Sequence, residues 1–305
     1  MISRSPATAL MTLVIAAFWL LVSLPAIAQS RQYTLTAPDG VTLAVQETGN
    51  PDGKPILFIH GLLGSRLNWE NQLKNPALQR YRLVTYDLRG HGLSGKPTDM
   101  AAYTEGQRWG DDLDTVIHAL DLQKPVLVGW SLGGAVMTNY LAAHGDDEIA
   151  GAVYVDGVVE LKPDQIQPHP GVYRDMVSTD LKTHLDAERT FLELCFHQLP
   201  DTTTFDRLVA NAALASWDMQ RSVQSMSIPA AKGLGEARVP LLFISGAQDA
   251  LLKAEPTIAR ARQINPGLKS VLYTDSGHAP FLEESERFNR DLLDFMAVTG
   301  AAQAD

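Results

Sequence analysis

The stretch Val126-Leu-Val-Gly-Trp-Ser131-Leu-Gly-Gly134 decides the fold of this chain. Three residues that favour β-strands lead into Gly-x-Ser-x-Gly, and residues 135–143 then have the composition of a helix. A serine on such a strand-to-helix turn has a strained backbone that exposes its hydroxyl. Gly129 and Gly133 are small because the strand and the helix pass close together. The pattern predicts that Ser131 is a nucleophile; the alternative is an ordinary Gly/Ser turn.

Strand candidates recur on both sides of this stretch and alternate with helical patterns, notably at residues 106–120. Such alternation predicts an α/β fold with a mostly parallel, eight-stranded sheet and helices on both faces. Reactive groups then gather at the carboxyl ends of the strands. The first two candidates flank Pro38-Asp-Gly40 and predict an antiparallel hairpin. The predicted strands are residues 33–36, 41–47, 55–59, 82–86, 126–128, 151–155, 240–244 and 270–273.

Residues 158–232 interrupt the alternation. This segment has no strand candidate, but its prolines separate helix-like patterns at 171–176, 179–199 and 204–216. A helical insertion between two strands predicts a lid over the site, without a core of its own. The core of the fold then comprises residues 29–157 and 233–299, and residues 300–305 form a tail.

Residues 1–28 have the pattern of an export signal. Arg4 is the only charged residue, residues 9–24 are almost continuously apolar, and Ala26-Ile-Ala28 is a small-x-small site before Gln29. The pattern predicts a cleaved signal peptide and a mature protein that is periplasmic or secreted. The alternative is a retained N-terminal anchor, and only then is the membrane a partner.

Composition excludes several classes of partner. The chain has 305 residues and a formal net charge of -10, which argues against binding nucleic acid. Its single cysteine, Cys195, lies in an apolar helix-like pattern and is predicted to be a buried thiol. Neither paired metal ligands at short spacing nor a Gly-rich nucleotide loop is present, so no metal and no cofactor are expected.

The order of the motifs resembles the α/β-hydrolase superfamily over residues 32–296. After the hairpin come a strand with His60-Gly61, the loop Asp87-x-Arg-Gly-x-Gly-x-Ser94, and the Gly-x-Ser-x-Gly-Gly stretch. The helical insertion, a strand with Gly-x-x-Asp249 and the pair Gly277-His278 follow. The nearest branch contains serine esterases, lactonases, carbon–carbon bond hydrolases and cofactor-free haloperoxidases.

A serine nucleophile needs a base and an orienting acid. The resemblance implies His278 as the base, on a loop after the last strand. It implies Asp249 as the acid, in the chain order Ser, Asp, His that this fold uses. The competing acid is Asp156, directly after the strand at residues 151–155, because some relatives carry the acid there.

The oxyanion needs two N–H donors. One is expected from Leu132, directly after the nucleophile, and the resemblance implies that the other comes from Leu62. His60 is expected to be a structural loop residue, and the Asp87–Ser94 loop is expected to brace the edge of the sheet rather than bind a metal or phosphate.

These residues predict a serine hydrolase that cleaves small or medium carboxylic esters or lactones through an acyl-enzyme. Four aromatic side chains are candidates for an apolar substrate pocket, with the core as the alternative: Trp69, Trp130, Phe196 and Trp217. The alternative functions are a perhydrolase or cofactor-free haloperoxidase, a carbon–carbon bond hydrolase, and a non-catalytic binding protein of the same fold.

Overall fold

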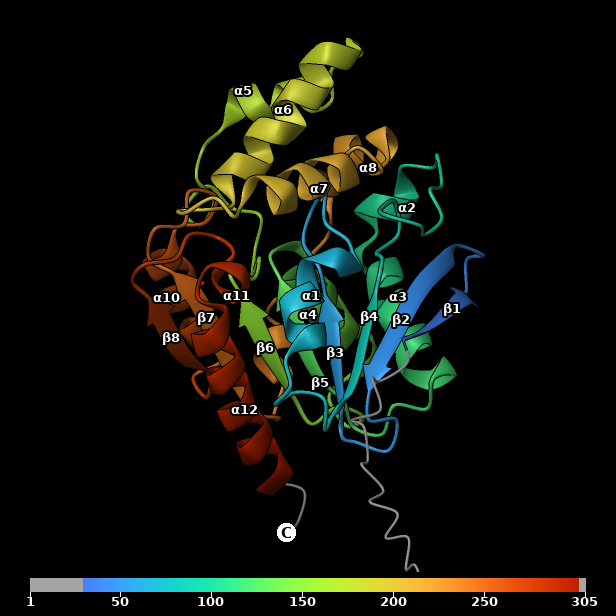
Figure 1. The fold of residues 1–305 in the computed structure, drawn as a ribbon, viewed down its shortest axis with the longest axis vertical. Helices are drawn as coiled ribbons and strands as arrows, with labels where there is room; N and C mark the ends of the chain where they lie inside the picture. Colours follow the sequence, from blue (N-terminus) through green and yellow to red (C-terminus); the bar gives the residue numbers. More distant parts are fainter. Residues whose placement is uncertain (1–29, 302–305) are drawn as a thin grey trace, which may run out of the picture.

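A computed structural model describes residues 30–301 and contains an eight-stranded sheet between two layers of helices (Figure 1). The strand order is β1-β2-β4-β3-β5-β6-β7-β8. Strand β2 runs opposite to the other seven strands. The eight predicted strands, including the hairpin, are confirmed to within two residues at each end. They are β1 Arg31–Thr36, β2 Thr42–Gly49, β3 Pro55–Ile59, β4 Arg82–Tyr86, β5 Val126–Trp130, β6 Gly151–Val155, β7 Leu241–Gly246 and β8 Lys269–Tyr273.

The helices cover both faces of the sheet, as predicted (Figure 1). In front lie α1 (Glu70–Lys74), α11 (Pro280–Glu283) and α12 (Ser285–Ala301). On the opposite face lie α3 (Gly106–Ala119) and α4 (Leu132–His144), with α9 (Gly233–Glu236) and α10 (Ala254–Ile264) continuing that layer. The 3₁₀ turn η1 (Arg66–Trp69) and α2 (Ala101–Thr104) belong to the loops at the carboxyl edge.

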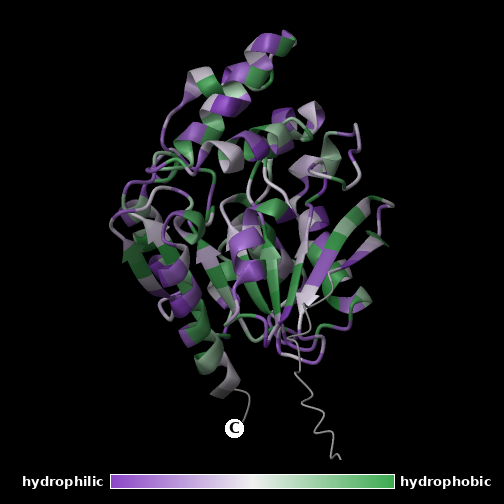
Figure 2. Cartoon of the chain, viewed as in Figure 1, coloured by the Kyte–Doolittle hydropathy of each residue, from purple (hydrophilic) through white to green (hydrophobic). Residues whose placement is uncertain are grey.

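The core is formed by the central strands and the helices packed on them. Every residue of β3, β5 and β6 is buried, and Figure 2 shows these strands as apolar while the outer helices are mixed. Parallel strands covered on both faces need no polar face, which explains their continuous apolar runs.

The helical insertion, residues 158–232, lies above the carboxyl ends of the central strands (Figure 1). It contains α5 (Pro170–Asp175), α6 (Leu181–Leu194), α7 (Thr202–Ala212), α8 (Trp217–Ser222) and the turn η2 (Val223–Ser225). The predicted helix at 179–199 ends five residues early. The N–H groups of His197 and Gln198 bond to a side chain outside the insertion, and Pro200 cannot continue a helix. That the insertion acts as a lid stays a prediction.

The ends of the chain are only partly described. The predicted signal peptide, residues 1–28, lies outside the described residues, as do residues 302–305 of the predicted tail. Helix α12 extends through Ala301, so the core ends two residues later than predicted. Among residues 30–301, no helix combines the length and the apolar character needed to cross a membrane.

The turn between β5 and α4 packs closely against the end of β3. A Cβ atom on Gly133 would lie 2.5 Å from the carbonyl oxygen of Ile59 and 3.1 Å from that of His60. Both atoms belong to the backbone at the end of β3, which hydrogen bonds to β5 hold in place. The backbone at the end of β3 therefore leaves no room for a Cβ atom at position 133, which explains why glycine is needed there.

We expect Gly133→Ala to lower the free energy of unfolding by about 1–3 kcal/mol, because backbone must shift to admit the methyl group. The matched control is Gly171→Ala in α5, where nothing lies within 4 Å of an added Cβ. That control should leave stability unchanged or raise it by up to about 1 kcal/mol. Urea denaturation of both variants measures the difference, and equal stability of the two would contradict the packing argument.

Candidate active site

Ser131 occupies the strained turn between β5 and α4. Its backbone has φ 53° and ψ −115°, a region that a residue with a Cβ rarely adopts. Hydrogen bonds hold the turn: the Ser131 N–H donates to Val155 O at 3.0 Å, and its carbonyl accepts from Gly134 N and Val158 N, both at 2.9 Å. The strain at this serine, predicted from the motif, is present and is stabilised by its neighbours.

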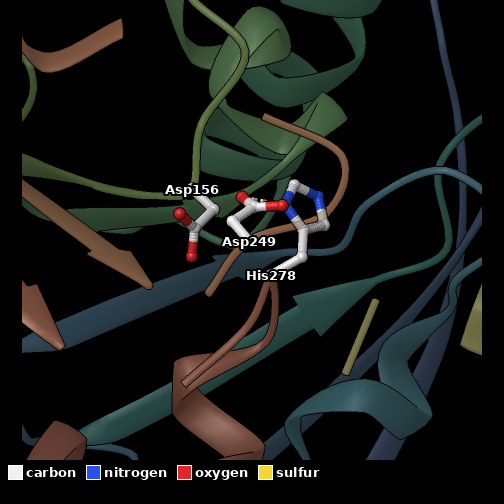
Figure 3. Close-up of side chains that lie close together, drawn as sticks. All are labelled: Asp156, Asp249 and His278. Atoms are coloured by element: carbon white, nitrogen blue, oxygen red, sulfur yellow. Dashed lines mark hydrogen bonds and ion pairs between the residues drawn. The ribbon is translucent and has the colours of Figure 1, made fainter. Parts of the chain in front are cut away.

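His278 lies on the loop between β8 and α11 and is hydrogen-bonded to Asp249. The distance from its Nδ1 to Asp249 Oδ2 is 2.7 Å, and both side chains are buried (Figure 3). Trp130 Nε1 donates to the His278 carbonyl at 2.6 Å and fixes the loop. His278 Nε2 has no hydrogen-bond partner within residues 30–301. When Nδ1 donates to the carboxylate, Nε2 of the neutral ring is left as an acceptor.

The two candidate acids are neighbours. Asp249 follows β7 and Asp156 follows β6, and adjacent parallel strands bring both carboxyl groups to the same edge (Figure 3). Asp249 bonds to His278, whereas Asp156 Oδ1 accepts from Ser245 Oγ at 2.5 Å and from Gly246 N at 3.1 Å. Of the two, Asp249 therefore has the contact that orients the imidazole.

Asp156, Asp249 and His278 also place one potential metal-ligand atom each within 4.8 Å of one another, the only such group among the described residues. The His278 and Asp249 atoms that face each other already form a hydrogen bond. Asp156 Oδ1 accepts two hydrogen bonds. Hydrogen bonding thus accounts for the cluster without a cation.

The predicted oxyanion residues lie at the same hollow as Ser131 and His278. Leu62 and Leu132 both line it. Leu132 is the first residue of α4, so its N–H has no acceptor within the helix. Gly61 allows the Leu62 loop to approach, because a Cβ there would lie 2.9 Å from Ser131 Cβ. The positions suit N–H donors aimed at an oxygen beside Ser131.

His60 has the structural environment that was expected. It is fully buried, and burial lowers its pKa to about 4. Its Nε2 accepts from Leu88 N at 2.9 Å, so Nδ1 carries the hydrogen that is donated to Gly61 O at 2.7 Å. His60 therefore fastens the oxyanion loop to the loop after β4 as a neutral ring.

The Asp87–Ser94 loop is held by internal hydrogen bonds and ion pairs. The Asp87 carboxylate accepts from the backbone N–H groups of Arg66 and Leu93 at 2.9 Å each. Arg89 forms two 2.7 Å bonds with Asp112 and reaches Asp39 at 2.9 Å. These contacts join the loop to η1, to α3 and to the turn between β1 and β2.

The hollow beside Ser131 has a volume of about 570 Å³, part of it open to solvent. Residues of the helical insertion form much of its wall, and no Lys, Arg, Asp or Glu side chain lines it. A site of this kind suits a neutral, largely apolar ligand. Its lining is Leu62, Ser131, Leu132, Val158, Leu161, Ile166, Tyr173, Phe191, Val223, Gln224, Met226, Ile228, Leu251, Leu252 and His278.

The structure corrects the predicted aromatic pocket, because none of its four residues lines the hollow. Trp69 is fully buried against Phe281, and Trp130 supports the His278 loop. Phe196 packs on Phe205 within the insertion. Trp217 Nε1 donates a hydrogen bond to His184 Nδ1, which also belongs to the insertion. The aliphatic residues that do line it lie in loops and short helices, and no sequence pattern shows which way they face.

Two further side chains lie near the site: Cys195, which belongs to the insertion, and Glu283, which contacts the insertion. Cys195 is buried, as predicted, and burial raises the pKa of its thiol well above the usual value. Glu283 was not predicted: its carboxylate accepts from Gly277 N at 2.9 Å, His197 N at 2.9 Å and Gln198 N at 2.8 Å. Glu283 thereby joins the insertion to the residue preceding His278. Glu283 is the last residue of α11, and the sequence gave no sign of its partners.

Comparison with known proteins identifies the family of the chain. A solved structure described as a "putative aryl esterase" from Burkholderia cenocepacia is 69% identical, covers 89% of this chain and 100% of its own, and has a TM-score of 0.88. A non-heme chloroperoxidase of Kitasatospora aureofaciens is 27% identical over 86% of this chain and 98% of its own length. A bifunctional esterase/perhydrolase of Acinetobacter calcoaceticus is 26% identical over the same shares.

The family model described as the alpha/beta hydrolase fold matches residues 54–285. This range contains Ser131, Asp249 and His278 and runs from β3 into the start of α12. The match covers well over half of the chain and agrees with the observed sheet and its helices. The chain therefore belongs to the α/β-hydrolase fold family.

Proposed function

We propose that this protein is a serine hydrolase that cleaves neutral carboxylic esters of small or medium size through an acyl-enzyme. The observation that carries the proposal is the shared position of Ser131 and His278 at one apolar hollow, with His278 Nδ1 bonded to Asp249 and its Nε2 left as an acceptor. The similarity to the Burkholderia cenocepacia protein favours aryl esters among the substrates.

In the first step of the proposed mechanism, His278 Nε2 takes the proton of Ser131 Oγ as that oxygen attacks the ester carbonyl. Asp249 stabilises the imidazolium and holds the ring in place. The N–H groups of Leu62 and Leu132 donate hydrogen bonds to the developing oxyanion; a donor of this kind typically contributes about 100- to 1,000-fold in kcat. His278 then protonates the leaving alcohol.

In the second step, water attacks the acyl-enzyme and gives its proton to His278, after which Ser131 departs with that proton. Lactones fit the same scheme, because a lactone is a cyclic ester whose leaving alcohol stays attached to the acyl group. The apolar wall built by the insertion excludes water from the acyl chain, which strengthens the hydrogen bonds to the oxyanion.

Perhydrolysis is the second candidate activity. Its support is the similarity to the esterase/perhydrolase of Acinetobacter calcoaceticus and to the chloroperoxidase of Kitasatospora aureofaciens. Hydrogen peroxide would replace water in the second step, and the product would be a peracid, with the proton passing to His278 as before. The first step and its residues are common to both activities.

We further propose that the protein is exported and that cleavage falls between Ala28 and Gln29. The basis is the apolar run followed by Ala26-Ile-Ala28. N-terminal sequencing of the protein purified from its own host should begin at Gln29. A sequence that begins at Met1, with the protein in the membrane fraction, would support a retained anchor instead.

Ser131→Ala should remove the nucleophile and lower kcat by about 10⁴-fold or more, since the remaining groups give only residual catalysis. A fluorophosphonate probe should label the wild-type protein and not this variant. The matched control is Ser178→Ala, an equally small change at a serine of the insertion that does not line the hollow. Labelling that persists in Ser131→Ala would contradict the proposed nucleophile.

The uncharged hollow predicts discrimination by charge and size. Phenyl butyrate should be cleaved about 100-fold faster, in kcat/KM, than the phenyl monoester of succinate, which has the same length but a terminal carboxylate that would be buried without a partner. In kcat/KM, p-nitrophenyl palmitate should be at least about 10-fold poorer than p-nitrophenyl butyrate, because the palmitoyl chain is too long for the hollow.

The same acyl donors, supplied with hydrogen peroxide, test for peracid formation. Equal rates on the charged and neutral phenyl esters would contradict the proposed substrate class. Peracid formation that survives in Ser131→Ala would contradict a common acyl-enzyme.

A further inference from the structure

A second buried carboxyl group lies beside the acid of the proposed triad. Asp156 is fully buried at the end of β6, and its backbone has φ 40°, a left-handed conformation that aspartate tolerates better than most residues. Figure 3 shows Asp249 between Asp156 and the His278 ring. The ligand atoms of all three side chains lie within 4.8 Å of one another. The proposed mechanism gives Asp156 no role.

Both carboxylate oxygens of Asp249 accept hydrogen bonds from N–H groups. Its Oδ1 accepts from the backbone N–H groups of Leu251 and Leu252 at 2.7 and 3.0 Å, and its Oδ2 bonds to His278. Three N–H donors on one carboxylate favour its charged form. Within residues 30–301, the only ion-pair partner of Asp249 within 4.0 Å is His278.

Two adjacent buried carboxylates repel each other, and with so little cationic charge nearby one of the pair keeps a proton. Asp156 receives fewer N–H donors than Asp249. Its Oδ1 accepts from Ser245 Oγ and Gly246 N, whereas its Oδ2 has only a shared contact with Gly246 N at 3.2 Å. Oδ2 is thus the atom available to hold a hydrogen directed at Asp249.

We propose that Asp156 is a positioning residue: a neutral carboxylic acid at pH 7 that donates a hydrogen bond to Asp249. The catalytic part of this inference rests on the proposed function, while the protonation of Asp156 does not. The hydrogen bond fixes the rotation of the Asp249 carboxylate and so the orientation of the His278 ring. Because Asp156 is neutral, it does this without adding a second negative charge that would hold the proton on the imidazole.

The charges around the pair agree with this assignment. Burial, followed by the charge of Asp249, raises the pKa of Asp156 well above its usual value. The insertion contributes Cys195 and Tyr173 near Asp249; burial raises the pKa of the thiol, and it raises the pKa of the phenol to about 12. Both groups are therefore neutral at pH 7, and neither competes for the charge.

The direct test is infrared spectroscopy of the full-length protein at pH 8. A protonated carboxyl group has a C=O stretch above the amide bands, and a carboxylate does not. We expect the wild-type protein to show this band and Asp156→Asn to lose it. The matched control is Asp146→Asn, a buried aspartate that bonds to backbone N–H groups of Arg238 and Val239 and whose pKa is lowered despite burial.

In the control the band should remain. The proposal would be overturned if the wild-type spectrum minus the Asp156→Asn spectrum showed no band of a protonated carboxyl group. This outcome does not depend on activity, so it is distinguishable from a failure of the proposed function, which would instead be seen in the Ser131 variants.

The kinetic test compares two substitutions of the same residue. Asp156→Ala removes the donor and should lower kcat by about 10- to 100-fold, the effect of one lost hydrogen bond to a charged group, with a smaller change in KM. Asp156→Asn keeps an amide donor for Asp249 and should recover much of that loss. Asp146→Asn should leave kcat and KM unchanged.

The pH profile separates a neutral Asp156 from an ionised one. With a neutral acid, Asp156→Asn leaves the acid limb of kcat/KM where it is in the wild type. If Asp156 were ionised, the same substitution would remove a negative charge near the imidazole and move the acid limb to lower pH. Such a shift would overturn the proposal even if Asp156→Ala failed to fold. If Asp156→Ala does fold, an Asn variant no more active than it would also overturn the proposal.

Discussion

The close approach of β3, β5 and α4 is the constraint on which the rest of the site depends. Gly133 allows the first turn of α4 to lie against the end of β3, and Ser131, two positions earlier, has a positive φ of 53°. The strained turn is held by the hydrogen bond from Ser131 N–H to Val155 and by those that the Ser131 carbonyl accepts from Gly134 and Val158. The rigid strands on both sides stabilise this strained conformation. The hydroxyl is consequently fixed at the rim of the sheet rather than on a mobile loop.

The sheet also explains how residues far apart in sequence come together. Asp156 and Asp249 follow the neighbouring parallel strands β6 and β7, and His278 lies on the loop after the next strand, β8. Parallel strands present all their carboxyl ends at one edge, so the order of strands fixes the order of side chains along that edge. The oxyanion loop after β3 completes the arrangement from the other side of β5, because β3 is the other neighbour of β5.

The sequence predicted most of this framework because its signals are local. Continuous apolar runs marked the buried strands, and the Gly-x-Ser-x-Gly turn marked the position of Ser131. The choice between Asp249 and Asp156 could be made only as a preference, since both follow strands and only the coordinates reveal which one faces Nδ1 of His278. The pocket aromatics were predicted wrongly, because a large apolar side chain has the same sequence signature in a core as in a pocket. Trp69 is core, and short aliphatic residues form the wall instead.

Glu283 gives the insertion a connection to the chemistry that its position above the sheet alone would not provide. One carboxylate oxygen accepts from the residue before His278, and the other accepts two N–H groups of the insertion. The carboxylate thus couples two segments: without the contacts to His197 and Gln198 it would lose two of its N–H donors, and the peptide group next to the imidazole would lose part of its support.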